Sequence, residues 1–355
     1  MSACIEEKRK KAIRLYIKYD KCAADVIREL SYPEPKNLEK VVQDTRRALY
    51  RPFVKTNLYF GDMLIHRRGQ FDDLFPSNDA SNLVILSPGK TERREYSVLI
   101  ADSIVDLNIF DGGVQCFPLY YYVRDSRNQL SLFDEVGRGE YERQDGVSNF
   151  ILQRAKTQYG KRVTKEDIFF YVYGLLHSQD FRSRFSVDLQ KMLARIPLVT
   201  SKDDFWAFSN AGRRLADLHI HYESVPAHPD VVVNGAELGN YRIEKMRFRR
   251  VKVKVDGKDR TVDDKSTIHY NSTITISNIP DKAYEYVVNG RSAIEWIVDR
   301  YQVRTDKKSG ITNDPNGWAE EVGNPRYILD LLLSVINVSV QTVDIVDNLP
   351  RLKFD

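Results

Sequence analysis

The chain has 355 residues, of which 42% are hydrophobic and 29% are charged. This length predicts two or three packed units, and the composition excludes a disordered or collagen-like chain. The 54 Lys and Arg side chains against 50 Asp and Glu side chains give a net charge of +4. So small an excess does not by itself indicate a nucleic-acid partner.

Cysteine usage and the apolar segments indicate a cytoplasmic protein. Three cysteines without a C-x-x-C pair argue against a disulfide framework and against a cysteine zinc site. Glu6, Glu7 and a basic cluster stand near the N-terminus, which is not the pattern of a signal peptide. The most apolar stretch, residues 327–340, is interrupted by polar side chains and is shorter than the roughly 20 residues of a bilayer helix. We therefore expect a cytoplasmic location and no membrane partner.

Residues 1–49 are expected to form a helical arm or spacer. They are rich in Lys, Arg, Glu and Ala, and their apolar residues recur near helical spacing. The Tyr-Pro-Glu-Pro sequence at 32–35 breaks this pattern, and a second short helix is predicted over residues 38–49.

Residues 50–122 predict a β-rich layer, because short β-branched and aromatic runs alternate with Gly, Pro and Asp turns. Two or three helices are predicted between residues 164 and 223. A final helical section follows residue 280, and Asn324-Pro325 is expected to open its last helix. Three pairs have the spacing of a capping box: Thr164 with Asp167, Ser201 with Asp204, and Ser292 with Glu295.

Strands are predicted again over residues 241–276. Apolar side chains occupy even positions up to Phe248 but odd positions from Val251 onward. A one-residue β-bulge at Arg249-Arg250 would restore a single buried face and align Arg247, Arg250, Lys252 and Lys254 on the opposite face. Asp256-Gly257 is a strong hairpin-turn signal.

Several local sequences imitate enzyme motifs. Gly89-Lys90-Thr91 lacks the leading glycine of a phosphate-binding loop, so a turn is the better interpretation. Asn324-Pro-Arg-Tyr327 approaches the loop of adenine methyltransferases, but no glycine-rich loop for S-adenosylmethionine accompanies it. His219 and His221 would share a metal only on a strand. We therefore assign no catalytic residue and no metal site.

The basic stretch 245–260 holds eight Lys and Arg side chains against two aspartates. A two-stranded ribbon of this kind fits the DNA major groove, where such side chains neutralise phosphates or read guanine edges. The alternative is a solvated sheet edge protected by charge. The first candidates for DNA contact are Arg247, Arg249, Arg250, Lys252, Lys254, Lys258 and Arg260.

Two further groups of candidates lie outside this ribbon. Arg67 and Arg68 precede a glycine turn, whereas Lys90, Arg93 and Arg94 share a predicted loop. Asn271 and Thr273 are predicted on a strand adjacent to the ribbon. Their side chains suit the reading of adenine or thymine edges.

Five long strings, in order from residue 48 to 346, resemble the C-terminal specificity region of the type ISP family of single-polypeptide restriction-modification enzymes. They are ALYRPFVKTNLYF at 48–60, DGGVQCFPLYYY at 111–122, EDIFFYVYGLLHSQDFRSRF at 166–185, IPDKAYEYVVNGRSAIEWIVDRYQV at 279–303, and NPRYILDLLLSVINVSVQTVDIV at 324–346.

The resemblance implies recognition of a short, asymmetric sequence in double-stranded DNA. It also implies partners elsewhere in the enzyme: an adenine methyltransferase, a helicase-like translocase and a nuclease. S-adenosylmethionine, ATP and Mg²⁺ would bind to those parts, and no cofactor is expected in this chain. The expected fold is α+β, with a mixed β-sheet recognition domain packed with helices over residues 50–355, behind the N-terminal arm. The recognition domain could be divided into two lobes, residues 50–225 and residues 226–355.

Two other classes of function remain open from the sequence. A metal-dependent nuclease would use Asp230, Asp256 and Lys258, and these three side chains would have to converge in space. A protein-interaction module without DNA binding would show a neutral surface potential over residues 245–260.

Overall fold

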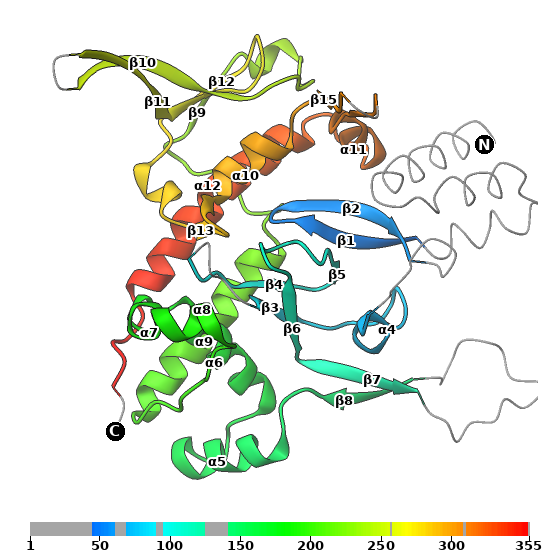
Figure 1. Cartoon of the computed structure of the whole chain (residues 1–355), viewed down its shortest axis with the longest axis vertical. Coiled ribbons are helices and arrows are strands. Elements are labelled where there is room, and N and C mark those ends of the chain that lie inside the picture. Colours follow the sequence, from blue (N-terminus) through cyan, green and yellow to red (C-terminus); the bar gives the residue numbers. More distant parts are fainter. Residues whose placement is uncertain are drawn as a thin grey trace, which may run out of the picture.

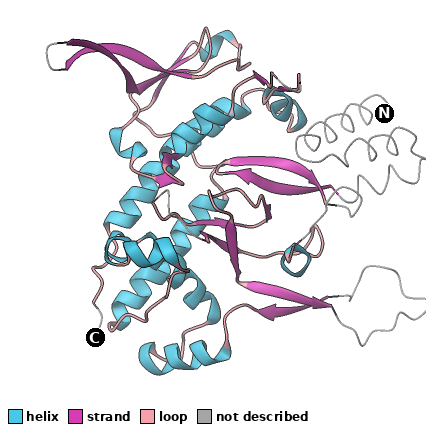
Figure 2. Ribbon diagram, in the orientation of Figure 1, coloured by secondary structure: helices cyan, strands magenta, loops and turns pink. Residues whose placement is uncertain are grey.

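The computed structural model describes residues 45–60, 69–89, 95–124, 141–255, 258–307 and 310–353. Within these ranges the chain is α+β, as expected, but its strands form six small sheets instead of one large sheet (Figures 1 and 2). Five of these sheets are purely antiparallel, and only the sheet that contains the first strand also has a parallel pair.

The first described strand corrects the last part of the helix predicted over residues 38–49, whereas residues 38–44 and the rest of the predicted helical arm lie outside the described residues. Residues 45–49 belong to β1 (Thr45–Arg51), whose neighbours are β2 (Val54–Tyr59) and, in parallel, β5 (Ile104–Val105). Helix-favouring Arg, Ala and Leu residues form a strand here because the ladder to β2 buries Ala48 and Leu49, and such tertiary contacts outweigh local propensity.

Two further sheets follow along the chain. A three-stranded sheet has the order β4-β3-β6, and a hairpin of two strands, β7 and β8, projects beyond it (Figure 1). Their bounds are β3 (Val84–Pro88), β4 (Leu99–Ala101), β6 (Val114–Pro118), β7 (Tyr120–Arg124) and β8 (Tyr141–Asp145), with the short helix α4 (Phe71–Leu74) before β3.

The helical layer between residues 149 and 220 contains more helices than predicted. It comprises α5 (Asn149–Tyr159), α6 (Lys165–His177), α7 (Gln179–Arg184), α8 (Ser186–Lys191) and α9 (Lys202–Ile220). Thr164 and Asp167 form the predicted capping box of α6, and the Ser201 side chain accepts a hydrogen bond from the Asp204 N–H at the start of α9. Helices α6 and α9 cross closely at Gly174 and Gly212, where a Cβ on Gly212 would lie 1.9 Å from the Phe170 carbonyl oxygen.

The C-terminal section combines a four-stranded antiparallel sheet, in the order β10-β11-β12-β9, with a long helix. Its elements are β9 (Val232–Asn234), η1 (Ala236–Leu238), β10 (Arg247–Val255), β11 (Lys258–His269), β12 (Thr275–Ser277), η2 (Asp281–Tyr284), β13 (Val287–Val288), β14 (Arg291–Ser292), α10 (Ala293–Arg300), β15 (Arg304–Thr305), β16 (Thr312–Asn313), α11 (Asn316–Glu321) and α12 (Tyr327–Asp347). The predicted capping box of Ser292 and Glu295 begins α10. Asn324 Oδ1 accepts a hydrogen bond from the Arg326 N–H just before α12, so the methyltransferase-like sequence is a helix entry.

The β4-β3-β6 sheet separates two hydrophobic cores. Val84 and Leu86 on β3 face the first core, whereas Ile85 faces the second, as the alternation of side chains along a strand requires. The first core joins residues 48–110 to residues 222–343, and the second is built mainly from residues 119–218. The first core contains residues of both predicted lobes, so the two cores do not follow the division between residues 225 and 226. That division stays a prediction.

Helix α12 is the one helix in the described ranges that is long and apolar enough to cross a membrane. Most of its side chains are buried within this chain, where Leu329, Leu332 and Ile336 are completely covered. The helix therefore serves as the core of the C-terminal section.

Candidate nucleic-acid interface

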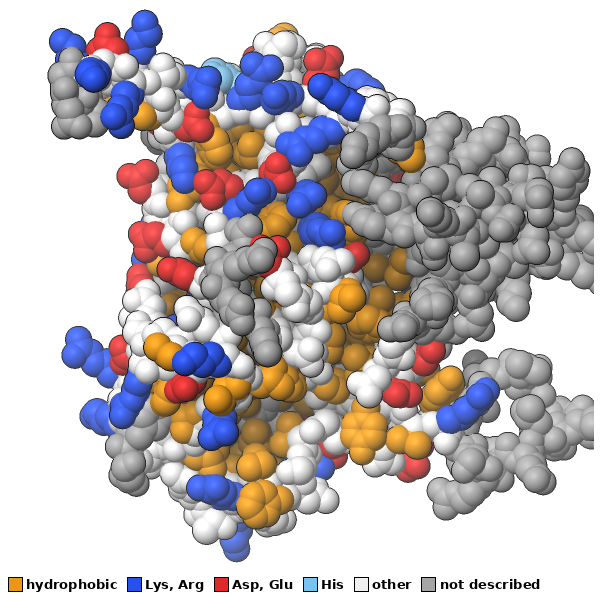
Figure 3. Space-filling view, viewed as in Figure 1, with side chains coloured by type: hydrophobic (Ala, Val, Ile, Leu, Met, Phe, Trp, Pro, Cys, Tyr) orange, Lys and Arg blue, Asp and Glu red, His pale blue; other side chains and the backbone are white. Residues whose placement is uncertain are grey.

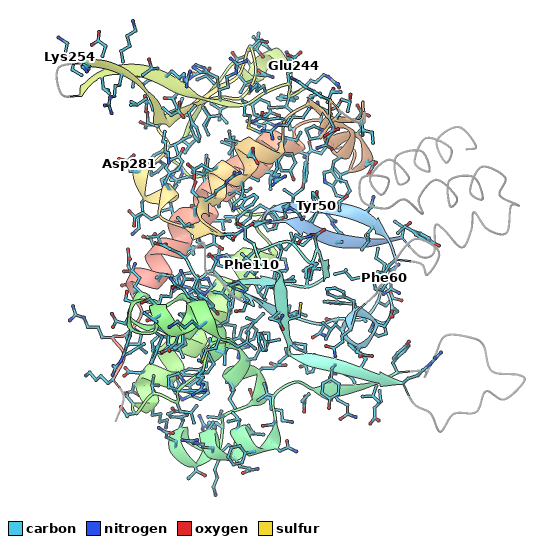
Figure 4. All side chains as sticks on the ribbon, viewed as in Figure 1. Tyr50, Phe60, Phe110, Glu244, Lys254 and Asp281 are labelled. Carbon is cyan, nitrogen blue, oxygen red and sulfur yellow. The ribbon has the colours of Figure 1, made fainter. Side chains whose placement is uncertain are left out.

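A two-stranded ribbon of β10 and β11 projects from the body of the protein (Figure 1, upper left). Only the base of β11, at Ile268 and His269, pairs with β12, so residues 249–255 and 258–264 have no further described strand beside them. Lys254 lies near the tip (Figure 4). At about 3.3 Å per residue, residues 249–255 extend roughly 20 Å.

The register of the ribbon has an irregularity where one was predicted, but the extra residues are on the other strand. Phe248 pairs with Ile268, whereas the next residue, Arg249, pairs with Asp264. The extra residues are therefore Lys265–Thr267 of β11, and β10 itself carries no inserted residue. Hydrogen bonds from the Ser266 N–H and hydroxyl to Asp264 Oδ1 hold this irregular stretch in place. The sequence pattern of β10 alone could not show which of the two strands contains the extra residues.

The basic side chains lie on both faces of the ribbon. Arg250, Lys252 and Lys254 alternate along β10 and share one exposed face, which we call the outer face. Arg247 is also exposed, but because β10 has no inserted residue, alternation places it on the same face as Arg249 and does not align it with the other three. At the base of the strand, Met246 is buried in the first core and Phe248 packs against it. By alternation from their partners, Arg249, Lys258 and Arg260 belong to the opposite face. The seven predicted contacts therefore do not form one surface.

Acidic residues of β11 neutralise part of this charge. Arg249 pairs with Asp264 through Nε at 2.7 Å, and Arg250 pairs with Asp263 at 3.5 Å. Hydrogen bonds from Ser266 and Arg249 lower the pKa of the Asp264 carboxyl, so this partner is ionised at neutral pH. Among the described residues, Lys252 has no ion pair and lies opposite Thr261.

The other predicted contacts have different outcomes. Asn271 lies in the turn between β11 and β12, where its amide donates to the carbonyls of Asn240 and Arg242 and its oxygen accepts from the N–H groups of Thr273 and Ile274. The prediction that Asn271 and Thr273 lie on a strand is therefore wrong, because the turn uses both polar ends of the Asn271 side chain. Arg67, Arg68, Lys90, Arg93 and Arg94 lie outside the described residues.

The convergence that a nuclease would need does not occur between Asp230 and Lys258. The Asp230 carbonyl accepts a hydrogen bond from Asn278, and the next residue, Ile279, donates a hydrogen bond to the Ser266 carbonyl of β11. Lys258 is at the opposite end of β11, on the order of 20 Å away. Asp256 is outside the described residues. In the described parts of the chain, no group of three or more His, Cys, Asp and Glu side chains is placed to hold a metal ion.

The two neighbouring histidines also point apart. His219 is buried between the Tyr173 hydroxyl, 2.6 Å from Nδ1, and the Thr342 hydroxyl, 3.0 Å from Nε2. Burial, with the nearby positive charge of Arg182, lowers the pKa of His219 to about 3. His221 is exposed and pairs with Asp217, so these histidines have structural and surface roles.

Sequence reasoning missed a second group of basic side chains. Arg51, Arg291, Arg300 and Arg304 come from separate elements and gather near Asp299 at the end of α10. Several Lys and Arg side chains, with Asp and Glu side chains among them, lie on the surface below the ribbon (Figure 3). No local signal joins Arg51 to the others, because it lies more than two hundred residues before them in the sequence.

Comparison with known proteins gives the class to which this fold and ribbon belong, the specificity domains of restriction-modification enzymes. The family model described as "Type ISP C-terminal specificity domain" matches residues 4–331, and the chain belongs to this family. No curated protein matches the chain.

Three solved structures are similar to the chain. The ATP-dependent Type ISP restriction-modification enzyme LlaBIII, bound to DNA, is 35% identical with a TM-score of 0.76, over 99% of this chain and 22% of that one. A nuclease-deletion mutant of the Type ISP enzyme LlaGI, in complex with a DNA substrate mimic, is 37% identical with a TM-score of 0.69, over 88% of this chain and 25% of that one. The DrdV–DNA complex is 26% identical with a TM-score of 0.73, over 96% and 31% of the two chains. The chain thus spans about a quarter of the length of these proteins.

Proposed function

We propose that this chain recognises a short, asymmetric sequence in double-stranded DNA as the specificity part of a restriction-modification enzyme. It places the target adenine before a methyltransferase in another part of that enzyme, where S-adenosylmethionine binds. ATP and Mg²⁺ serve the translocase and nuclease parts, and this chain carries no catalytic step of its own. The enzyme acts in the cytoplasm against phage DNA.

The projecting ribbon is the observation that carries this proposal, together with the family match. The major groove is about 12 Å wide and 8.5 Å deep, and two strands about 4.8 Å apart fit within it. The ribbon extends roughly 20 Å, which is more than the depth of the groove. Its outer face presents Arg250, Lys252 and Lys254 to a partner.

The ion pairs divide these side chains into two kinds of contact. Lys252, with no acidic partner in the described chain, is free to neutralise a phosphate. Arg250 is held by Asp263 only at 3.5 Å and through exposed side chains, so its planar guanidinium can turn to the edge of a guanine. Exposed ion pairs of this geometry contribute at most about 1 kcal/mol, which a bidentate base contact replaces.

The test is selection of bound duplexes from a randomised pool, at two salt concentrations and without ATP, S-adenosylmethionine or Mg²⁺. Enrichment of one asymmetric motif of several base pairs supports an autonomous recognition domain. Salt-sensitive binding with no enriched motif overturns that autonomy and assigns sequence reading to the combination with the methyltransferase. Absence of binding at both salt concentrations overturns DNA recognition and favours the protein-interaction module.

A further inference from the structure

Four arginines from separate elements meet at the C-terminal end of α10, and we call them the α10 arginine cluster. Arg51 ends β1, beside Tyr50 (Figure 4), Arg291 begins β14, Arg300 ends α10 and Arg304 begins β15. More than two hundred residues separate the first from the others along the chain. The cluster thus exists only in the folded protein.

The cluster carries more positive charge than its acidic neighbours neutralise. The Asp299 carboxylate pairs with three of the four guanidinium groups, Arg291 at 3.0 Å, Arg304 at 2.9 Å and Arg300 at 3.5 Å. Arg51 pairs with Asp106 at 2.7 Å. Four guanidinium groups therefore share two carboxylates, and the like charges repel one another at these short distances.

Arg300 is the least satisfied member of the cluster. Its Nε is buried, lies 3.5 Å from Asp299 Oδ2, and makes no hydrogen bond to any described residue. Burial lowers the pKa of Arg300, Asp299 opposes this shift, and the positive charges of Arg51 and Arg291 add to it. A guanidinium presents five N–H donors, so a half-buried one with few partners favours an added anion.

A tryptophan holds two of these guanidinium groups in position. The Trp296 ring lies 5.3 Å from the Arg291 guanidinium carbon and 5.4 Å from that of Arg300. Trp296 is itself fixed by a hydrogen bond of 2.8 Å from its indole N–H to the Val288 carbonyl. Such stacking reduces the conformational entropy that the arginines would lose on binding a ligand.

A hollow of about 370 Å³ lies between Arg291 of the cluster and Phe248 at the base of the ribbon. Phe248 of β10 forms one wall of the hollow, and residues of β14 and α10 form the other. The lining residues are Phe248, Gly290, Arg291, Glu295, Val298, Asp299 and Gln302. A duplex whose groove receives the ribbon has phosphates on both sides of that groove. The hollow lies between the ribbon base and Arg291, and the carboxylates in its lining are those of Glu295 and Asp299.

We propose that the α10 arginine cluster binds a backbone phosphate of the duplex that the ribbon enters. This rests on the proposed function, and it adds a contact that anchors the DNA across the face between β10 and β1. A phosphodiester oxygen pair fits the planar fork of an arginine, which lysine does not reproduce. Asp299 orients the cluster, and at the same time it limits the affinity of the cluster for an anion.

The first test compares the salt dependence of DNA binding in the full chain and in the double variant Arg291→Gln/Arg304→Gln. If each of these arginines meets a phosphate, the slope of log K against log salt falls by about 0.9 for each, or about 1.8 in total. The matched control is Arg213→Gln, because Arg213 also pairs with an aspartate, at 2.7 Å, and stacks on an aromatic ring, at 4.3 Å, but lies on α9. The control is expected to keep the slope of the unmodified chain.

The second test uses Asp299→Asn, which separates phosphate binding from a purely structural role. Removal of this negative charge is expected to tighten DNA binding, although it breaks three ion pairs. An unchanged slope in Arg291→Gln/Arg304→Gln, or an Asp299→Asn protein that is folded by circular dichroism but binds DNA no more tightly, overturns the proposal. In either case DNA binding by the unmodified chain still supports the proposed function. A failure of the unmodified chain to bind DNA overturns both.

Discussion

The ribbon makes a quantitative prediction for the double variant Lys252→Ala/Lys254→Ala. Both side chains are exposed on the outer face, and neither forms an ion pair with a described residue. Lys252 lies opposite Thr261, and Lys254 lies opposite Asp259. Because neither lysine belongs to a hydrophobic core, the substitutions remove charge with little effect on folding.

The expected magnitude follows from the number of phosphate contacts removed. Each lysine that meets a phosphate contributes about 0.9 to the slope of log K against log salt, so the slope falls by about 1.8. Between 50 and 200 mM salt, the affinity of the unmodified chain should therefore fall about tenfold further than that of the variant. Since phosphate contacts carry no sequence information, the loss should be the same on every duplex.

The measurement is the fluorescence anisotropy of labelled duplexes, titrated with protein at four salt concentrations. Two duplexes of equal length and different sequence show whether the loss is uniform. The control is Lys161→Ala/Lys191→Ala, which removes two exposed lysines from the turn before α6 and the end of α8. The control should keep the original slope.

A slope equal to that of the unmodified chain would remove the outer face of the ribbon from the DNA interface. Loss of affinity on one duplex only would also contradict the reasoning, because it would assign base reading to a lysine that we place at a phosphate. A reduced slope with a uniform loss of affinity is the result that the structure predicts.

Three further predictions concern stability and the turn beside the ribbon. Gly212→Ala should lower the free energy of unfolding by about 1–3 kcal/mol, because the new Cβ would lie 1.9 Å from the Phe170 carbonyl oxygen. The control Asn210→Ala changes an exposed residue of the same helix and should leave the free energy of unfolding unchanged. Equal melting temperatures for the two variants would contradict the packing of α6 on α9. Burial lowers the pKa of His219 from 6.5 to about 3, so the unfolded chain binds a proton that the folded chain excludes. The contribution of His219 to the free energy of unfolding is therefore complete above pH 6.5 and falls by about 2 kcal/mol by pH 5. Urea titrations should show that the stability of His219→Asn depends less on pH than that of the unmodified chain. Asn271→Ala should lower the free energy of unfolding by about 1–3 kcal/mol, because it removes the hydrogen bonds that hold the turn between β11 and β12. If the variant is instead as stable as the unmodified chain and loses base preference at one position of the selected DNA motif, Asn271 reads a base, as the sequence predicted.

Local sequence predicted those elements whose signals lie within a few residues. The capping boxes of α6 and α10 are present because a side chain and the N–H three residues later interact within one helical turn. The change of apolar parity at Arg249-Arg250 likewise predicted an irregularity of the ribbon, and the strand pairing is irregular between Phe248 and Arg249. The five strings that resemble type ISP specificity regions predicted the family that the model match shows.

Longer-range pairing decided what these local signals could not. Residues 45–49 form a strand because β2 and β5 pair with them, although their composition favours a helix. The three extra residues at Lys265–Thr267 are visible only when β11 is placed beside β10. The same pairing brings Asp263 and Asp264 against Arg250 and Arg249, so it reduces the charge that the sequence of β10 alone suggests.

The sequence by itself thus determined the α+β class, the helix starts, the alternating basic strand and the family. Tertiary structure alone decided which basic side chains are free and which are neutralised, and it alone assembled the α10 arginine cluster around Asp299. The physical reason is range. Helix capping and side-chain alternation act over two to four residues of sequence. Electrostatic pairing depends on the distance between charges in space, and the arginines of the cluster come within a few ångströms of their carboxylates only when β1, β14, α10 and β15 have folded together.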